Sequence, residues 1–226
     1  MLVLTGCFIL AFGWFGFNPG STLGASGNGN LRIGSVAVNT MLAGMAGGFS
    51  AMFYMWIRYG KPDASMSGNG LLAGLVAITA PSGFVNPVAS VLIGLIAGIL
   101  VCASVEFVDR TLKVDDPVGA ISVHGANGLW GVIAVGLFAD GKSNYGGSWN
   151  GVTGSVTGLF YGDASQLAAQ LIGVSVLIGI VFTISFLFYL LVDMIFGQRV
   201  SAKDELEGLD VPEMGAVGYP EFMLKG

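Results

Sequence analysis

Apolar residues run along this chain in long stretches that contain no charged side chain. Five such stretches cover residues 1–31, 33–57, 64–105, 118–139 and 164–192. A helix needs about 20 residues to cross about 30 Å of hydrocarbon. The third stretch is long enough for two crossings, and Pro81, Gly83 and Pro87 interrupt it where the chain would have to reverse. The pattern therefore predicts an all-α integral membrane protein.

We predict six transmembrane helices, at residues 2–18, 36–59, 69–80, 88–108, 117–138 and 166–196. The third range is short for a span, so we expect that helix to begin near Ala64 and to end at Pro81. Residues 143–162 also lack charge, but they are rich in Gly, Asn, Ser and Thr, which is typical of a loop. We expect a membrane region over residues 1–197 and a polar cytosolic tail over residues 198–226.

The composition supports this architecture and excludes several other classes. Hydrophobic residues make up 54% of the 226 residues and charged residues only 10%, too few to cover a water-exposed surface. The 37 glycines have no three-residue period, which excludes collagen, and the apolar content excludes a disordered chain. Glycine pairs four residues apart predict close helix packing. These pairs are Gly44 and Gly48, Gly70 and Gly74, and Gly94 and Gly98.

The charged residues predict the orientation in the membrane. With the N-terminus in the cytoplasm, seven basic residues lie inside and two, Arg32 and Lys142, lie outside, as the positive-inside rule requires. The inner seven are Arg58, Lys61, Arg110, Lys113, Arg199, Lys203 and Lys225. Both termini are then cytoplasmic. Six of the fourteen acidic residues lie in the tail, so nothing favours nucleic-acid binding.

The N-terminus and the cysteines need separate interpretation. No basic segment precedes the apolar start, so we expect a membrane helix rather than a secretory signal. A helix that begins at Met1 without a polar flank indicates that sequence is missing upstream. Cys7 and Cys102 lie in apolar runs without metal-ligand spacing, so we interpret them as small buried hydrophobic residues.

His124 is the only histidine, and it lies in the fifth predicted span. Asp116 and Pro117 predict the start of that helix, with the carboxylate as N-cap and proline at the first position. At 1.5 Å per residue, His124 would then lie about 10 Å inside the helix end. Ionisable side chains are costly in a membrane. The ring is therefore either a neutral partner for a neighbouring helix or a group that holds a polar solute or relays a proton.

Aromatic residues cluster where the first span ends, in the predicted orientation toward the outer face. Trp14, Phe15 and Phe17 are followed by the hydroxyl of Ser21. Aromatic faces attract cations with about 0.5 to 2 kcal/mol, so this cluster is a candidate site for a small cation. An aromatic belt at the membrane interface explains it equally well.

No enzyme is indicated. Asp115, Asp116 and Asp193 lie at helix ends, away from a partner for His124, and no G-x-S-x-G motif occurs. The glycine-rich segment over residues 146–162 lacks the G-K-[ST] ending of a phosphate-binding loop. We expect no cofactor and no metal site.

Five motifs, in this order along the chain, resemble those of the ammonium transporter family, Amt/Mep/Rh, and most closely its bacterial and archaeal Amt branch. They are GWFGFNPGS (13–21), GLLAGLVAIT (70–79), VDDPVGAISVH (114–124), GLFYGDASQLAAQLIGV (158–174) and EGLD (207–210). The resemblance is collinear and covers essentially the whole chain.

The resemblance implies a fold and a function. Members are trimers of eleven-helix subunits, each with its own pore, built from two inverted five-helix repeats and a last helix. Phe17 matches the phenylalanine that helps close the outer mouth, and Ser21 matches the hydroxyl of the outer ammonium site. His124 matches one of two pore histidines, and Trp14 resembles a pore-lining tryptophan. The tail resembles the regulatory tail that contacts neighbouring subunits and PII-type signalling proteins.

The implied function is transport of ammonium or ammonia across the cell membrane. Ammonium would be recruited near Phe17 and Ser21 and deprotonated, and the neutral species would pass His124 while the proton is relayed separately. This avoids the cost of desolvating a cation in an apolar pore.

The chain also departs from the family pattern. It aligns only with the family's sixth to eleventh helices, so the partner histidine, the second gate phenylalanine and one aromatic residue of the outer site are absent. Pro19 stands where alanine is more usual, and Met214 where a tail histidine is common. Two alternatives therefore stay open: an inactive, truncated fragment, or an ammonium sensor that signals through its tail.

Overall fold

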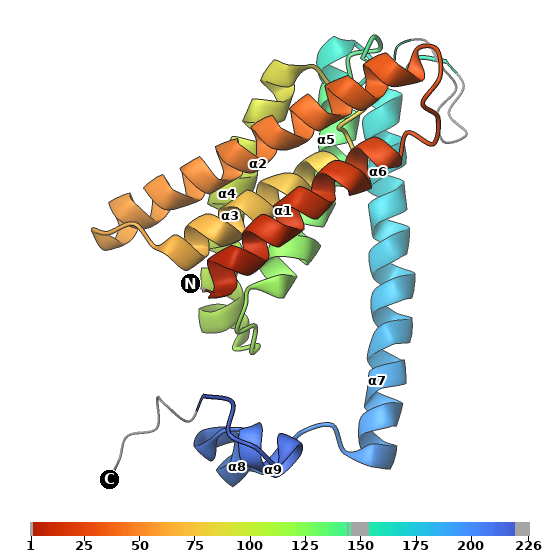
Figure 1. Cartoon of the computed structure of the whole chain (residues 1–226). Helices are drawn as coiled ribbons and strands as arrows, with labels where there is room; N and C mark the ends of the chain where they lie inside the picture. Colours follow the sequence, from red (N-terminus) through yellow and green to blue (C-terminus); the bar gives the residue numbers. More distant parts are fainter. Residues whose placement is uncertain (1, 144, 146–153, 220–226) are drawn as a thin grey trace. The chain divides into compact units, whose positions relative to one another are not determined.

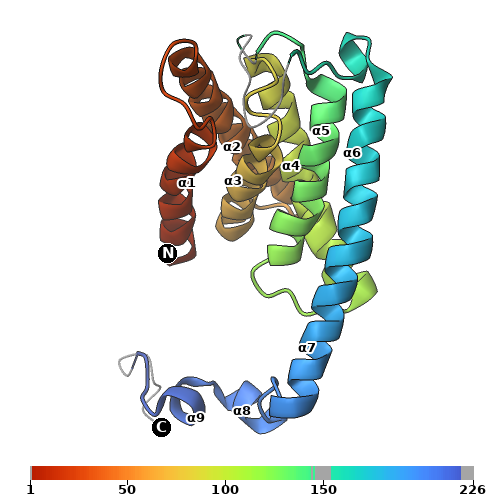
Figure 2. The same ribbon diagram turned by 90° about the vertical axis from the view of Figure 1, so that its right-hand side faces the viewer.

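The structure is a computed structural model that describes residues 2–143, 145 and 154–219. These residues form a set of helices (Figures 1 and 2), and the only strand-like pairing among them is the isolated bridge between Asp140 and Thr157. The predicted all-α fold class is confirmed. The chain divides into two compact units, Met1–Val174 and Ser175–Gly226.

Unit 1 holds most of the helices. They are α1 (Leu2–Gly20), α2 (Gly29–Tyr59), α3 (Ala64–Thr79), α4 (Pro87–Phe107) with the π turn η1 (Val108–Leu112), the π turn η2 (Ile121–Ala126), α5 (Asn127–Phe138) and the 3-10 turn η3 (Leu159–Tyr161). A continuous helix then starts as α6 (Ala164–Leu177) and leads through the π turn η4 (Ile178–Phe182) into α7 (Thr183–Phe196). Unit 2 also contains α8 (Ala202–Glu207) and α9 (Asp210–Met214).

All six predicted spans are helical. Five of them are long and apolar enough to cross a membrane, and the third, α3, has 16 residues. As expected, α3 begins at Ala64, where the carboxylate of Asp63 caps it by accepting a hydrogen bond from the Met66 backbone N–H (2.7 Å). Of the predicted loop at residues 143–162, the described residues form irregular structure and η3, and the rest lies outside the described residues.

Two predicted helix starts are wrong. The second span begins at Gly29 rather than residue 36, so Arg32 lies inside α2 and not in a loop. Arg32 is only 3% exposed, and its guanidinium lies 5.1 Å from the centre of the Phe84 ring, a cation–π contact that helps to stabilise this burial. The fifth span begins at Ile121 rather than Pro117, because Pro117 and Val118 form a turn before Gly119, whose φ is +69°.

Helices α2, α3 and α4 pack with their backbones in contact through glycine. A Cβ added at Gly74 or Gly94 would overlap with the Ala43 carbonyl oxygen, and one at Gly98 would overlap with the Gly47 carbonyl oxygen. The predicted packing roles of the pairs in α3 and α4 are thus confirmed. In α2, the tightest contact is at Gly47 rather than at the predicted Gly44 or Gly48.

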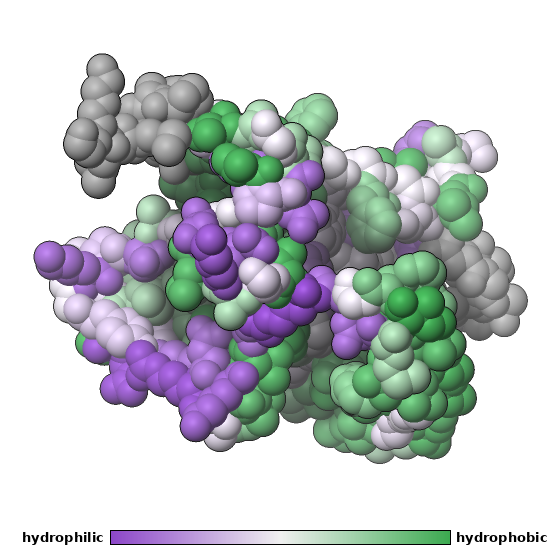
Figure 3. Space-filling model, turned by 90° about the horizontal axis from the view of Figure 1, so that it is seen from below, coloured by the Kyte–Doolittle hydropathy of each residue, from purple (hydrophilic) through white to green (hydrophobic). Residues whose placement is uncertain are grey.

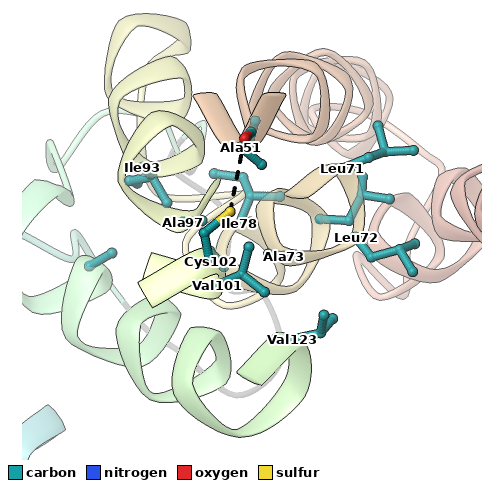
Figure 4. Close-up of a cluster of buried hydrophobic side chains, with 14 of the residues drawn as sticks. Ala51, Leu71, Leu72, Ala73, Ile78, Ile93, Ala97, Val101, Cys102 and Val123 are labelled. Carbon is teal, nitrogen blue, oxygen red and sulfur yellow. Dashed lines mark hydrogen bonds between the residues drawn. The ribbon is translucent and has the colours of Figure 1, made fainter. Parts of the chain in front are cut away.

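A core of small and branched apolar side chains fills the remaining space around α3. Figure 4 shows part of it, including Leu72, Ile78, Ile93 and Val101. Cys102 belongs to this core, with its Sγ 3.9 Å from the Ala51 carbonyl oxygen (Figure 4). Cys7 is also a member of this core. Both thiols are buried and free, as the sequence predicts.

The reversal between α3 and α4 places non-helical backbone inside the bundle. Buried Asn39 of α2 donates hydrogen bonds from Nδ2 to the carbonyl oxygens of Ser82 (2.9 Å) and Val85 (2.8 Å). Irregular backbone at membrane depth is tolerated only where protein satisfies its polar groups. One asparagine therefore supports the turn that the prolines predict.

The two ends of unit 1 differ in their number of basic residues. Glu106 near the end of α4 accepts a hydrogen bond from the Tyr59 hydroxyl (2.6 Å) and lies 3.9 Å from Arg58, which joins α4 to the end of α2. The loop from α2 to α3, which holds Lys61, and the π turn η1 and the residue after it, which hold Arg110 and Lys113, lie at this same end (Figure 1). The first turns of α2, which hold Arg32, and the segment after α5, which holds Lys142, lie at the opposite end (Figure 1). This separation agrees with the basic-residue count that predicts the orientation.

Much of the surface is apolar. Figure 3 shows one face, on which continuous hydrophobic areas lie beside hydrophilic ones. None of the residues of α6 and α7 is buried, and their exposed side chains are predominantly large and apolar. Such a surface is suited to hydrocarbon or to further protein rather than to water.

Candidate functional site

His124 lies in the π turn η2, at the start of the fifth span. Its side chain is exposed, and no described residue forms a hydrogen bond with the ring. The neighbouring Gly125 and Gly128 are also open, since a Cβ at Gly128 would meet nothing within 4 Å. The prediction that His124 lies about 10 Å inside the helix end is wrong. The helix starts later, so the ring is within its first turn.

Local structure explains the position of this turn. Asp116 does not cap a helix that begins at Pro117; instead its Oδ2 accepts a hydrogen bond from the Ile121 backbone N–H (3.0 Å) across the intervening turn. Ser122 and Val123 point into the core against α3 and α4. The turn therefore has a buried side and an open side, and His124 is on the open side.

Trp14 of α1 is held by α3. Its indole Nε1–H donates a hydrogen bond to Thr79 Oγ1 (2.9 Å), and the Thr79 hydroxyl in turn donates to the Leu75 carbonyl oxygen (2.8 Å). The Trp14 ring is half-buried and packs on the core. The sequence did not single out Thr79, although it ends one of the five motifs.

Phe17 and Ser21 lie one and two turns further along the chain. The Phe17 ring meets the Trp14 ring edge to face, with 5.9 Å between centroids, and the Phe17 side chain is 59% exposed. The Ser21 hydroxyl donates to the Phe17 carbonyl oxygen (2.7 Å). Because its proton is used in this way, the lone pairs of Oγ remain available to accept a hydrogen bond from a cation such as ammonium.

The structure brings three of the four predicted residues together. Trp14, Phe17 and Ser21 form one cluster at the end of α1, whereas α3 separates α1 from α5 in Figure 2. Among the described residues, no hydrogen bond or ring contact joins His124 to this cluster. The two parts therefore form separate stations on unit 1, one at the end of α1 and one at the start of the fifth span.

A hollow of about 620 Å³ lies at the end of unit 1 where α1 and α3 begin. Its lining includes Asn69, Asp109, Lys113 and Asp116, but not His124. Within the described part of the chain, no three His, Cys, Asp or Glu side chains lie close enough to hold a metal ion.

Comparison with known proteins identifies the family. Residues 1–219 match the family described as Ammonium Transporter Family. Ammonium transporter Amt2 of Archaeoglobus fulgidus is 46% identical over 96% of this chain and 45% of its own length. The ammonium transporter of Bacillus subtilis is 35% identical over 95% of this chain and 50% of its own length.

Solved structures give the same result. The structure titled Sensor Amt Protein matches with a TM-score of 0.79 and 39% identity, over 92% of this chain and 48% of the other. Candida albicans Mep2 matches with a TM-score of 0.78 and 30% identity, over 88% of this chain and 43% of the other. The chain thus spans about half the length of these relatives. The two curated relatives are named ammonium transporters, not enzymes. The family match and these identities together place the chain in the ammonium transporter family.

Proposed function

We propose that this chain supplies one half of an ammonium transport pathway. The observation that carries the proposal is the exposed imidazole of His124 on an otherwise apolar, membrane-spanning unit. A polar ring directed at lipid would be costly. Its open face is therefore suited to line a polar path, completed by protein that lies outside this chain.

The two stations have complementary chemistry. At the end of α1, the Phe17 ring offers a π face and Ser21 an acceptor oxygen, which suits a small cation with N–H donors. At the start of the fifth span, a neutral imidazole offers both a donor and an acceptor, which suits ammonia or a proton. Ammonium would bind at the first station, lose a proton and pass the second as ammonia.

The rest of the assembly follows from the family. We propose a homotrimer in the plasma membrane, with residues 1–197 in the membrane and residues 198–226 in the cytoplasm, and with both termini of this chain cytoplasmic. The tail would contact neighbouring subunits or a PII-type signalling protein. The separation of basic residues between the two ends of unit 1 supports the orientation.

His124→Ala tests the proposal in the complete protein. We expect methylammonium uptake by cells that lack other ammonium transporters to be lost, or to lose its coupling to charge movement, because no other histidine of this chain can replace the ring. Lys61→Ala, an exposed residue in a loop, is the control and should transport normally. Electrogenic uptake by His124→Ala at the wild-type level would contradict the proposal.

A sensor is the second candidate, because one of the matching structures is titled Sensor Amt Protein. A sensor would bind ammonium at the same station near Phe17 without sustained uptake. A truncated, inactive fragment is the third candidate. Reading the DNA upstream of Met1 separates the fragment from the others: an in-frame continuation that encodes five further helices favours a transporter or sensor, and a stop codon favours the fragment.

A further inference from the structure

Asn127 lies directly behind the π turn that carries His124. It is completely buried, yet it is a polar residue at the first position of α5. Its side-chain Nδ2 donates a hydrogen bond to the Ser122 carbonyl oxygen, five residues earlier, at 2.9 Å. Its backbone N–H bonds to the His124 carbonyl oxygen. Asn127 thus forms hydrogen bonds to two residues of the π turn, Ser122 near its start and His124 in its middle.

The turn is sharply divided between core and open face. Ser122 is completely buried and Val123 is 2% exposed, whereas His124 and Gly125 are exposed. A π turn contains one residue more than an α turn would, which rotates the side chains on one side of it relative to the helix that follows. The direction in which the His124 ring points therefore depends on whether this segment keeps its π-helical geometry.

Burial of an asparagine at this place has a cost. Asn127 Oδ1 and Ser122 Oγ are both buried without a hydrogen-bond partner among the described residues. An apolar residue of similar size would avoid part of that cost. The hydrogen bond that Nδ2 donates to the π turn therefore explains this buried amide better than packing does.

We propose that Asn127 is a positioning residue for His124. By bridging the turn to the Ser122 carbonyl, its amide keeps the π turn formed and holds the imidazole on the open face. The consequence for transport rests on the function proposed above, but the effect on the ring does not.

The single histidine makes the proposal directly measurable. Isotope labelling of histidine in the whole chain, reconstituted in lipid nanodiscs, gives NMR signals from the His124 ring alone. In Asn127→Leu, which has a similar size and no amide, we expect the ring signals to shift by more than their linewidth or to split into several conformers.

Asn39→Leu is the matched control. Asn39 is also completely buried and its amide also donates to backbone carbonyls, but these lie in the turn between α3 and α4. This variant should lose comparable thermal stability and keep the wild-type His124 signals. If folded Asn127→Leu kept them as well, or if Asn39→Leu moved them equally, the proposal would be overturned. If Asn127→Leu does not fold, Asn127→Ser is compared with the wild type in the same way, and unchanged His124 signals in that variant would overturn the proposal.

Transport provides an independent result. In the complete protein, Asn127→Leu should lower maximal methylammonium uptake roughly tenfold or more, as misplacement of a working group does, with little change in the half-saturating concentration. Shifted ring signals with unchanged uptake would leave the positioning role intact and contradict the proposed pore role of His124.

Discussion

At the scale of single residues, the proposed function depends on side chains that the fold leaves exposed. The side chains of Phe17 and His124 are exposed, although both residues lie on helices that pack against the apolar core. Hydrogen bonds fix the backbone or the neighbouring residues of each. Trp14 is anchored to Thr79, and Ser21 is anchored to the Phe17 carbonyl. These contacts fix the cluster at the end of α1 and leave the Phe17 ring exposed.

Phe17→Ala tests the first station. Loss of the ring removes a cation–π attraction of about 0.5 to 2 kcal/mol, so we expect the half-saturating methylammonium concentration of the complete protein to rise roughly two- to thirtyfold. Phe12→Ala is the control, because Phe12 is an aromatic residue of the same helix that is 83% exposed and outside the cluster. Equal effects of the two substitutions would argue against a site at Phe17.

Asp163 gives a prediction about pH. The hydroxyl and the backbone N–H of Ser165 donate to its carboxylate (2.6 and 2.8 Å) at the start of α6, and these bonds hold the pKa of Asp163 below its ordinary value of 3.8. A carboxyl group whose pKa is lower in the folded than in the unfolded state contributes its full stabilisation of the fold above pH 3.8. This stabilisation is lost as the pH falls through the folded-state pKa. We expect the protection factors of the amides in the first turn of α6, which correct for the intrinsic pH dependence of exchange, to fall over that range. Asp163→Asn should remove this pH dependence.

At the scale of elements, glycine sets how closely the helices approach. Gly74 and Gly94 each face the Ala43 carbonyl, so α3 and α4 both contact the same turn of α2. The sequence pattern identifies these pairs, but it does not show which partner each one meets. The contact depends on the rotation of each helix about its own axis, and this is set by all the side chains packed around it.

Gly94→Ala tests this contact. The added methyl group would overlap with backbone, which cannot move aside as a flexible side chain does, so we expect a loss of about 1–3 kcal/mol in the free energy of unfolding. Gly6→Ala is the control, since a Cβ there meets nothing within 4 Å, and it should be neutral or slightly stabilising. Thermal unfolding in detergent compares the two. A Gly94→Ala variant as stable as Gly6→Ala would contradict the backbone contact.

At the scale of the whole molecule, the chain spans about half the length of its relatives. Unit 1 has a well-packed core around α3, yet it leaves the His124 face open, and the relatives are about twice as long. The large apolar surface is consistent with contacts to lipid, to other subunits or to the rest of a longer protein.

The orientation of the chain in the membrane is testable with introduced cysteines. Cys7 and Cys102 are buried, so they should not react with a membrane-impermeant maleimide. We expect Ser26→Cys to be labelled in intact cells, and Lys61→Cys only after the membrane is permeabilised, because basic segments stay in the cytoplasm. The reverse pattern would overturn the proposed orientation.

The sequence by itself determined the class of the protein, the six helical spans, the turn at Pro81 and the family. The class, the spans and the turn follow from local composition, since charged side chains are costly in hydrocarbon and proline lacks the backbone N–H that a helix interior uses. The family follows from the resemblance of five sequence motifs. Only the tertiary structure decided that the helix of His124 begins at Ile121, that Arg32 is buried in α2 and that Asn127 bridges the π turn. Each of these depends on atoms that are distant in sequence, or on a choice between α and π turns that packing against α3 and α4 settles.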